Sequence, residues 1–289
     1  SYLGADPLLC DVRSDTWQLN IDLLEKWLEK NTAIEGNTLL HLETGRRISA
    51  IMPVHILGNM VDMDRLVVLA ERFKLTVIED AAEGLGSFQK GRHAGTIGAM
   101  GALSFNGNKI MTTGGGGMLL TNDDALAKRA RHITRQAKTD PLEYNHDEIG
   151  YNYRMVNVLA AMGVAQLENI GTFLTKKNQI ANTYSKAWSD MPFIIPQQIA
   201  DGISPNNWLY TMQCPRSREL LKHLADNGVQ SRPLWRPMNQ LPMFKDLPYI
   251  SENDVARQLN QDCLSIPCST NLSAEDQAEV VKHIKEFYD

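Results

Sequence analysis

The stretch Leu75-Thr-Val-Ile-Glu-Asp80 is a short apolar run that ends abruptly in two carboxylates. A predicted helix precedes it and begins after the capping residue Asp62. The apolar residues of that helix recur at the spacing of one face: Leu66, Leu69, Ala70 and Phe73. Another apolar, strand-like run lies before the helix, at 47–56. Apolar strands that alternate with amphipathic helices indicate a parallel sheet covered on both faces, so the sequence predicts an α/β protein.

The same pattern extends to both sides of this stretch. Upstream, Asn20 is expected to cap a helix over residues 21–30. Downstream, two more strands are expected at 102–105 and 117–121, on either side of a turn rich in Gly and Asn. A basic helix should then begin at Asn122 and reach about Gln136. The polar residues 139–153 are predicted to form a loop.

The chain is predicted to have three parts. Residues 1–155 form a large α/β domain with a mostly parallel sheet. Residues 156–190 form a long connecting helix, in which an interruption would fall near Gly171. Residues 191–289 form a smaller α+β domain, and its last helix is capped by Ser273 together with Asp276.

Composition narrows the class of protein. A hydrophobic content of 43% and a charged content of 22% are ordinary for a globular protein. The net charge of −5 argues against a nucleic-acid partner. No apolar run approaches the roughly 20 residues that span a bilayer, so no membrane segment is expected. The four cysteines lack metal-site spacing, which predicts reduced thiols in a cytoplasmic protein and no metal centre.

Two reactive side chains follow predicted strands. Asp80 comes directly after an apolar strand, and Lys109 lies in the turn after residues 102–105. Ligands of open α/β sheets bind beyond the carboxyl ends of the strands, where both side chains would lie. Each residue also has an ordinary interpretation, because an Asp after a strand is often a helix cap and a Lys in a turn is usually a solvated charge.

Several motifs occur in a fixed order. They are Glu79-Asp-Ala-Ala-Glu83, Leu103-Ser-Phe-Asn-Gly-Asn-Lys109, Thr113-Gly-Gly-Gly-Gly117, Gly150-Tyr-Asn-Tyr-Arg-Met155, Trp208-Leu-Tyr210 and Arg232-Pro-Leu-Trp235. In order and spacing they closely resemble the DegT/DnrJ/StrS aminotransferases, over nearly the whole chain. The resemblance implies the aspartate-aminotransferase fold (fold type I), with pyridoxal 5'-phosphate (PLP) as the cofactor.

The resemblance also implies roles for five residues. Lys109 would form an imine with the PLP aldehyde and then act as the base that moves a proton. Asp80 would keep the pyridine nitrogen protonated, and Ser104 would donate its hydroxyl to the phosphate. Glu83 stands where relatives often have Gln or His near the ring. Asn152 resembles an asparagine that reaches the phosphate in a neighbouring subunit, which implies a homodimer with shared active sites.

Five further residues are candidates for contacts with the substrate. Arg232, Trp235 and Arg236 are expected to line the entrance for a nucleotide sugar, because a guanidinium matches a diphosphate. Asn239 occupies a position where relatives often carry a histidine. His55 follows a strand and could lie near the site. The alternatives are a structural role for His55 and a place in the core for Trp235.

The activity implied by the resemblance is transfer of an amino group from L-glutamate to a nucleotide-linked 4-keto-6-deoxy sugar, which gives the 4-amino sugar. Carbon 4 is favoured by likeness to members that make bacillosamine-type and legionaminic-acid precursors. A rival is the dehydratase branch of the family, where histidine replaces the cofactor lysine, and Lys109 argues against it. Another is a truncated, non-catalytic or weakly PLP-binding relative, since family members begin with a further segment that this chain is expected to lack.

Overall fold

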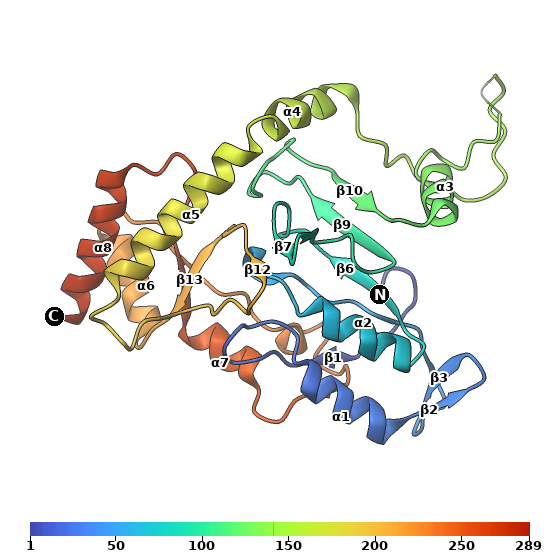
Figure 1. Ribbon diagram of the computed structural model, residues 1–289, viewed down its shortest axis with the longest axis horizontal. Helices are drawn as coiled ribbons and strands as arrows, with labels where there is room; N and C mark the ends of the chain where they lie inside the picture. Colours follow the sequence, from blue (N-terminus) through green and yellow to red (C-terminus); the bar gives the residue numbers. More distant parts are fainter. Residues whose placement is uncertain (141) are drawn as a thin grey trace.

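The computed structural model describes residues 1–140 and 142–289, and a four-stranded sheet lies at its centre (Figure 1). The strand order is β10-β9-β6-β5. The strands are β5 (Ala50–Ile51), β6 (Thr76–Asp80), β9 (Met100–Ser104) and β10 (Gly117–Leu120). Strands β5, β6 and β9 run parallel, and β10 is antiparallel to β9. The prediction of a mostly parallel sheet is confirmed.

The strand predicted at 47–56 is much shorter in the structure. Only β4 (Arg47–Ile48), β5 and a single bridge from Val54 to Asp80 are paired, followed by the 3-10 turn η1 (Ile56–Gly58). Pro53 has no N–H to donate within this run. Strand β4 instead joins a hairpin that was not predicted, formed by β2 (Thr32–Glu35) and β3 (Thr38–His41).

Helix α2 (Met63–Arg72) packs against β6 of this sheet, and α1 (Ile21–Asn31) lies beside α2 on the side away from the sheet (Figure 1). Both predicted caps are confirmed. The Asn20 side chain accepts from the Leu23 N–H at 3.1 Å, and the Asp62 side chain accepts from the Arg65 N–H at 3.3 Å. Their apolar faces join the sheet in the main core, which includes Leu24, Leu28, Met63, Leu66, Leu69, Val77 and Leu103.

Helix α3 (Asp124–Ile133) begins later and ends earlier than predicted. Its cap is Asp123 and not Asn122, because the Asp123 carboxylate accepts from the N–H groups of Ala125 and Leu126. A carboxylate also suits the positive end of the helix dipole. No residue of α3 is buried, and the loop that follows extends away from the body of the protein (Figure 1).

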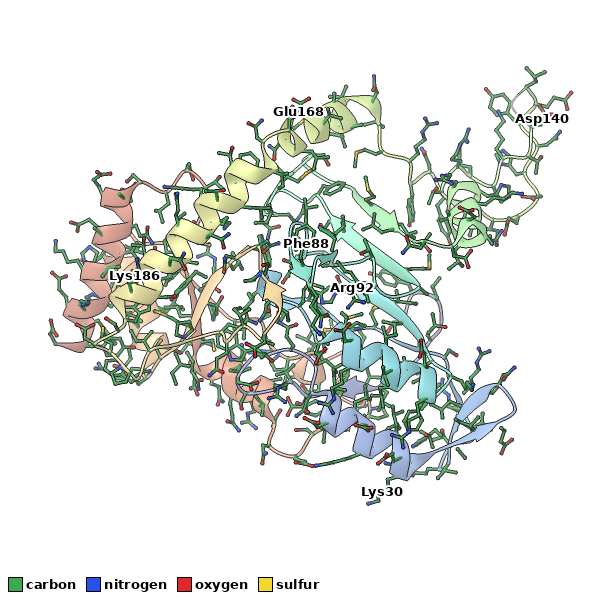
Figure 2. The ribbon with its side chains drawn as sticks, in the orientation of Figure 1. Lys30, Phe88, Arg92, Asp140, Glu168 and Lys186 are labelled. Carbon is green, nitrogen blue, oxygen red and sulfur yellow. The ribbon has the colours of Figure 1, made fainter. Side chains whose placement is uncertain are left out.

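The predicted connecting helix is two helices, α4 (Asn157–Leu167) and α5 (Ile170–Ala187), bent by 58°. The break lies at Glu168, labelled in Figure 2, and Asn169, and so comes before Gly171. No single helix in the described part of the chain is long and apolar enough to cross a membrane, although α4 and α5 pass such a test jointly.

The C-terminal part forms a second layer of sheet and helices. Its antiparallel sheet has the order β11-β13-β16-β14. The strands are β11 (Ile195–Pro196), β13 (Tyr210–Gln213), β14 (Arg232–Pro233) and β16 (Cys263–Ile266). The helices are α6 (Ser217–Asp226), α7 (Val255–Asp262) and α8 (Ala274–Tyr288). The predicted cap of the last helix is confirmed, because Ser273 Oγ accepts from the Asp276 N–H at 2.9 Å.

Short elements tie the two layers together. A parallel pair joins β1 (Leu9–Cys10) to β15 (Tyr249–Ile250). Another small sheet joins β12 (Ile203–Ser204) to β7 (Phe88–Gln89) and β8 (Arg92–His93). Outside these sheets, the 3-10 turn η2 covers Met238–Gln240. Such pairs fix segments that are far apart in the sequence.

Candidate active site

The site is built at the carboxyl ends of two neighbouring parallel strands. Asp80 is the last residue of β6, and Ser104 is the last residue of β9. The two strands pair in a register that places Asp80 opposite Ala102. The chain then turns back through 105–113, held by a hydrogen bond from the Thr113 N–H to the Phe105 carbonyl. Lys109 lies within this turn, so the fold brings the three predicted residues to one edge of the sheet.

The Lys109 amine is held between a carboxylate and an aromatic ring. Its Nζ lies 3.6 Å from Glu83 Oε1 and 4.1 Å from the centre of the Trp208 ring. The side chains of Lys109 and Glu83 are each only 14% exposed. A cation above an indole face is attracted to it, most strongly where water is excluded. The amine therefore has a defined position.

Glu83 has a second partner on the opposite side of its carboxylate. Glu83 Oε2 accepts from the Leu57 N–H at 2.7 Å. Burial raises the pKa of the Glu83 carboxyl, and nearby Asp80 adds to the rise, whereas the Leu57 N–H and Lys109 oppose it. Leu57 has a φ of +65°, a strained backbone for a leucine, so this contact holds a costly conformation in place.

Asp80 is half-buried, and no described residue donates a hydrogen bond to its Oδ2. In the described structure its one side-chain hydrogen bond comes from the Ala82 N–H to Oδ1, at 3.1 Å. Its backbone is fixed, since its carbonyl accepts from the His55 N–H and its own N–H donates to the Pro53 carbonyl. The result is a well-placed acceptor at the strand end.

His55 belongs to the core and not to a substrate surface, contrary to the expectation from its place after a strand. Its side chain is fully buried. Its Nε2 lies 2.8 Å from Glu79 Oε2, and its Nδ1 accepts from the Val61 N–H at 3.3 Å. Both ring nitrogens are thus satisfied inside the protein. The predicted alternative, a structural histidine, agrees with this geometry.

Among the described residues, Trp235 is the substrate candidate that reaches Lys109, indirectly, by stacking on Trp208. Trp235 is 50% exposed and stacks on Trp208 with ring centres 6.0 Å apart and planes 11° apart. Trp208 and Trp235 together form an aromatic wall that runs from Lys109 Nζ to the surface. The contacts recorded for the described residues do not bring Arg232, Arg236 or Asn239 to Lys109.

Asn152 lies apart from this site within one chain. It is exposed and pairs through its backbone with Arg135. Its neighbours Tyr151 and Tyr153 stack on each other with ring centres 5.0 Å apart. No contact in the described part of the chain joins Asn152 to Lys109, and its role in a neighbouring subunit stays a prediction.

Sequence reasoning missed two residues that shape the site. Trp208 belongs to the motif Trp208-Leu-Tyr210, but nothing near it in the sequence indicates that its ring faces Lys109. Asn206 was not singled out, yet its side chain donates to the carbonyls of Glu83 and Leu85. The sequence shows only an asparagine two residues before a tryptophan, and its burial is a property of the fold.

One other group of side chains has the composition of a metal site. His132, Asp147 and Glu148 offer ligand atoms that lie within 4.8 Å of one another. The group is largely exposed, and its carboxylates already pair with His132 and with Arg129. An exposed ion-pair network explains it without a metal.

The residues at the sheet edge fit PLP. A primary amine, a carboxylate with an open oxygen and a hydroxyl match its aldehyde, its pyridine nitrogen and its phosphate. Trp208 and Glu83 keep the amine within the site and partly out of water. Lys109, Asp80 and Ser104 are therefore the residues that would hold the cofactor.

Comparisons with known proteins agree with this chemistry. A model of the DegT/DnrJ/EryC1/StrS aminotransferase family matches residues 1–285. The GDP-perosamine synthase of Escherichia coli O157:H7 is 34% identical over 290 residues, covering 99% of this chain and 74% of that protein.

Solved structures support the same family. The crystal structure of a DegT DnrJ EryC1 StrS aminotransferase from Brucella abortus matches with a TM-score of 0.89 at 26% identity, covering 99% of this chain and 74% of that chain. DesV of S. venezuelae, solved in complex with a ketimine intermediate, matches with a TM-score of 0.83 at 26% identity, covering 98% of this chain and 72% of that chain. The chain belongs to the DegT/DnrJ/EryC1/StrS aminotransferase family, whose members are PLP-dependent sugar aminotransferases with the fold type I architecture.

Proposed function

We propose that this protein transfers an amino group from L-glutamate to carbon 4 of a nucleotide-linked 4-keto-6-deoxy sugar. The observation that carries the proposal is the Lys109 amine, held 3.6 Å from Glu83 at the sheet edge where the strands of Asp80 and Ser104 end. The relative named GDP-perosamine synthase supports a nucleotide-linked sugar as the substrate. The choice of carbon 4 and of glutamate comes from the motif resemblance.

Each residue at the edge has one task in this proposal. PLP supplies an aldehyde and an electron-withdrawing ring that makes a proton on the substrate carbon removable. Lys109 Nζ would hold the cofactor at its aldehyde and, once the amine of the donor has displaced it, would take up and return that proton. The Asp80 carboxylate would keep a proton on the pyridine nitrogen, and Ser104 Oγ would donate to a phosphate oxygen. Glu83 would keep Lys109 Nζ in its position.

We assign the substrate entrance to the exposed residues beside the aromatic wall. The outer face of Trp235 is free to pack against the sugar nucleotide. Arg232 and Arg236 are exposed, and a guanidinium forms paired hydrogen bonds with diphosphate oxygens. Asn239 lies in η2, directly after this segment, and would contribute a neutral amide where relatives carry an imidazole.

The active unit in this proposal is a homodimer. Helix α4 is apolar on all sides, and only Gly163 is buried within it. Its exposed apolar residues continue into the preceding loop: Tyr151, Tyr153, Val156, Val158, Met162, Val164 and Leu167. A contiguous apolar surface of this kind marks an interface. A second copy would cover α4 and would bring Asn152 to the neighbouring active site. A cytoplasmic location is consistent with the four free cysteines.

A direct assay tests the activity. The protein with PLP, L-glutamate and a nucleotide-linked 4-keto-6-deoxy sugar should form the 4-amino sugar and an equal amount of 2-oxoglutarate. The Lys109→Ala variant should form neither product, whereas Lys90→Ala, which removes a surface lysine paired with Asp64, should behave as the unchanged protein. Formation of a 3-amino sugar would contradict the carbon-4 assignment, and no amination of any keto sugar would contradict the function.

A further inference from the structure

We propose that Trp208 is a positioning residue that holds the Lys109 amine in its reactive place. This inference rests on the proposed role of Lys109 as the reacting amine. Trp208 is only 3% exposed, and its ring centre lies 4.1 Å from Lys109 Nζ. Its indole N–H, backbone N–H and carbonyl each have a hydrogen-bond partner, and the indole partner lies in the turn that carries Lys109.

The indole N–H fixes the ring against the turn that carries the lysine. Trp208 Nε1 donates to the carbonyl of Asn108 at 2.6 Å, although the two residues are 100 positions apart. Asn108 directly precedes Lys109 in the sequence. The hydrogen bond therefore couples the orientation of the ring to the backbone that carries the amine.

The backbone of Trp208 is held from two more directions. Its N–H donates to Asn206 Oδ1 at 2.7 Å, and its carbonyl accepts from Lys177 Nζ at 2.6 Å. Lys177 comes from α5, is 6% exposed and also donates to the Cys268 carbonyl at 2.7 Å. Burial lowers the pKa of Lys177, so placing a lysine here is unfavourable without such acceptors.

Asn206 also connects the two groups on either side of the amine. Its Nδ2 donates to the Glu83 carbonyl at 2.6 Å, while its Oδ1 accepts from the Trp208 N–H. The backbones of Glu83 and Trp208, the two residues whose side chains flank Lys109, are thus joined through one buried amide. Trp235 stacks on Trp208 and so adds a further residue of the C-terminal layer to the same arrangement.

The test measures how readily Lys109 reacts in the cofactor-free protein. Wild-type protein, Trp208→Leu and Trp208→Phe are treated with a small amine-reactive reagent, and the labelling rate of each lysine is read by peptide mapping. Trp27→Phe is the matched control, because Trp27 lies on α1 and stacks on His41. Two other lysines are internal references. The labelling rate of buried Lys177 reports whether the core has opened, and that of exposed Lys74 reports the activity of the reagent.

Loss of the ring should raise the labelling rate of Lys109 by about five- to tenfold in Trp208→Leu, with Lys177 and Lys74 unchanged. Trp208→Phe keeps an aromatic face and should restore most of the protection. Trp27→Phe should match the wild type.

Two results would overturn the proposal. Unchanged Lys109 labelling in Trp208→Leu would show that the ring does not hold the amine. A parallel rise at Lys109 and Lys177 would show that Trp208 only packs the core. Labelling needs neither PLP nor substrate, so the two proposals fail separately. An inactive wild-type protein would refute the proposed function, whereas the labelling rates alone decide whether Trp208 positions Lys109.

Discussion

At the scale of single residues, neighbouring carboxylates in β6 have different environments and different tasks. Glu79 and Asp80 follow each other along a strand, so their side chains point to opposite faces. The Glu79 carboxylate is fully buried and accepts from His55 and from the N–H groups of Gly95, Ile97 and Gly98. Asp80 keeps an open oxygen at the site. One carboxylate stabilises the fold and the other is available for chemistry.

Asp80→Asn should reduce turnover far more than stability. A neutral amide cannot hold the proton on the pyridine nitrogen. The activation free energy should therefore rise by several kcal/mol, and kcat/KM should fall on the order of a thousandfold. Steady-state kinetics together with thermal unfolding measure the two effects. Asp64→Asn, at a surface position paired with Lys90 and Arg92, is the control. Near-normal turnover in Asp80→Asn would mean that Asp80 is only a structural acceptor.

Glu79→Gln should lower the free energy of unfolding by about 2–4 kcal/mol at neutral pH. The groups around the Glu79 carboxylate are hydrogen-bond donors, and the N–H groups of a glutamine amide would find no acceptor among them. Burial acts to raise the pKa of Glu79, but the hydrogen bonds from His55, Gly98 and Gly95 outweigh it and hold the pKa below its usual value. A depressed folded-state pKa means that this stability is present above the unfolded pKa and is lost as pH falls through the folded pKa.

Denaturant unfolding of wild type and Glu79→Gln across the acid range measures this dependence. The difference between them should be constant above about pH 5 and should shrink as the pH falls below about 4. Glu71→Gln, an exposed change on α2, should show no such dependence. If the difference in the free energy of unfolding did not depend on pH, the Glu79 carboxyl would be uncharged in the folded protein.

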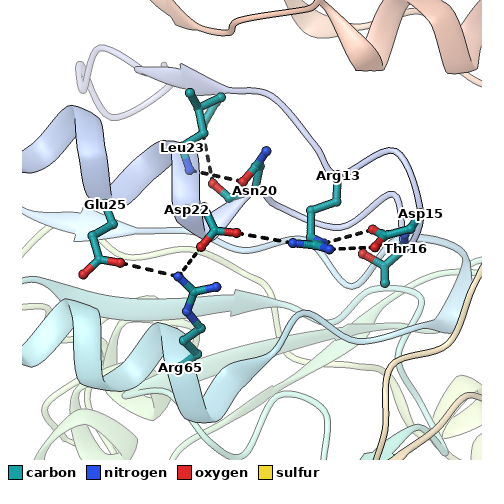
Figure 3. Close-up of polar contacts among 9 residues, drawn as sticks. Arg13, Asp15, Thr16, Asn20, Asp22, Leu23, Glu25 and Arg65 are labelled. Carbon is teal, nitrogen blue, oxygen red and sulfur yellow. Dashed lines mark hydrogen bonds and ion pairs between the residues drawn. The ribbon is translucent and has the colours of Figure 1, made fainter.

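At the scale of elements, α1 and α2 are joined by both apolar and ionic contacts. Figure 3 shows Arg65 between Asp22 and Glu25 of α1, with nitrogen–oxygen distances of 2.5 Å and 3.4 Å. Arg13 reaches the same Asp22 at 3.3 Å. These groups are partly exposed, and ion pairs in water contribute little. Leu66, on the inner face of α2, is completely buried.

We therefore expect packing to outweigh charge between these helices. Leu66→Ala should reduce the free energy of unfolding by about 2–5 kcal/mol, whereas Arg65→Ala should reduce it by less than about 1 kcal/mol. Chemical denaturation of the two variants gives both values. A larger loss from Arg65→Ala, persisting at high salt, would show that the network in Figure 3 is a major source of stability.

At the scale of the whole molecule, the exposed α4 surface and the isolated Asn152 lead to one expectation. If each site needs Lys109 from one chain and Asn152 from the other, Lys109→Ala and Asn152→Ala homodimers should both be impaired. A mixed dimer would contain one site with both residues intact. Mixing the two variants after dissociation should recover up to about half of the wild-type activity per mixed dimer.

The controls distinguish active sites shared between two chains from effects of dissociating and reassembling the subunits. Mixed dimers are isolated with two different affinity tags before the assay, and each variant is also dissociated and reassembled alone. Lys109→Ala mixed with wild type gives the activity of a single intact site. A verified mixed dimer without recovered activity would show that each active site is built from one chain.

The sequence by itself determined the features that depend on near neighbours. The caps at Asn20, Asp62 and Ser273 were predicted correctly, because a capping side chain bonds to an N–H three residues ahead. The order of apolar strands and amphipathic helices was sufficient for the parallel sheet. It was also sufficient to place Asp80 and Lys109 beyond strand ends.

Only the tertiary structure decided which side chains meet. The His55 ring turns inward because Glu79 and Val61 satisfy both of its nitrogens, and no local pattern distinguishes that from an active-site histidine. The ring of Trp208 faces Lys109 because the contacts that fix it come from α5, from Asn206 and from a turn 100 residues away. Such contacts form only when distant segments pack, so their energy is not encoded in any short stretch of sequence.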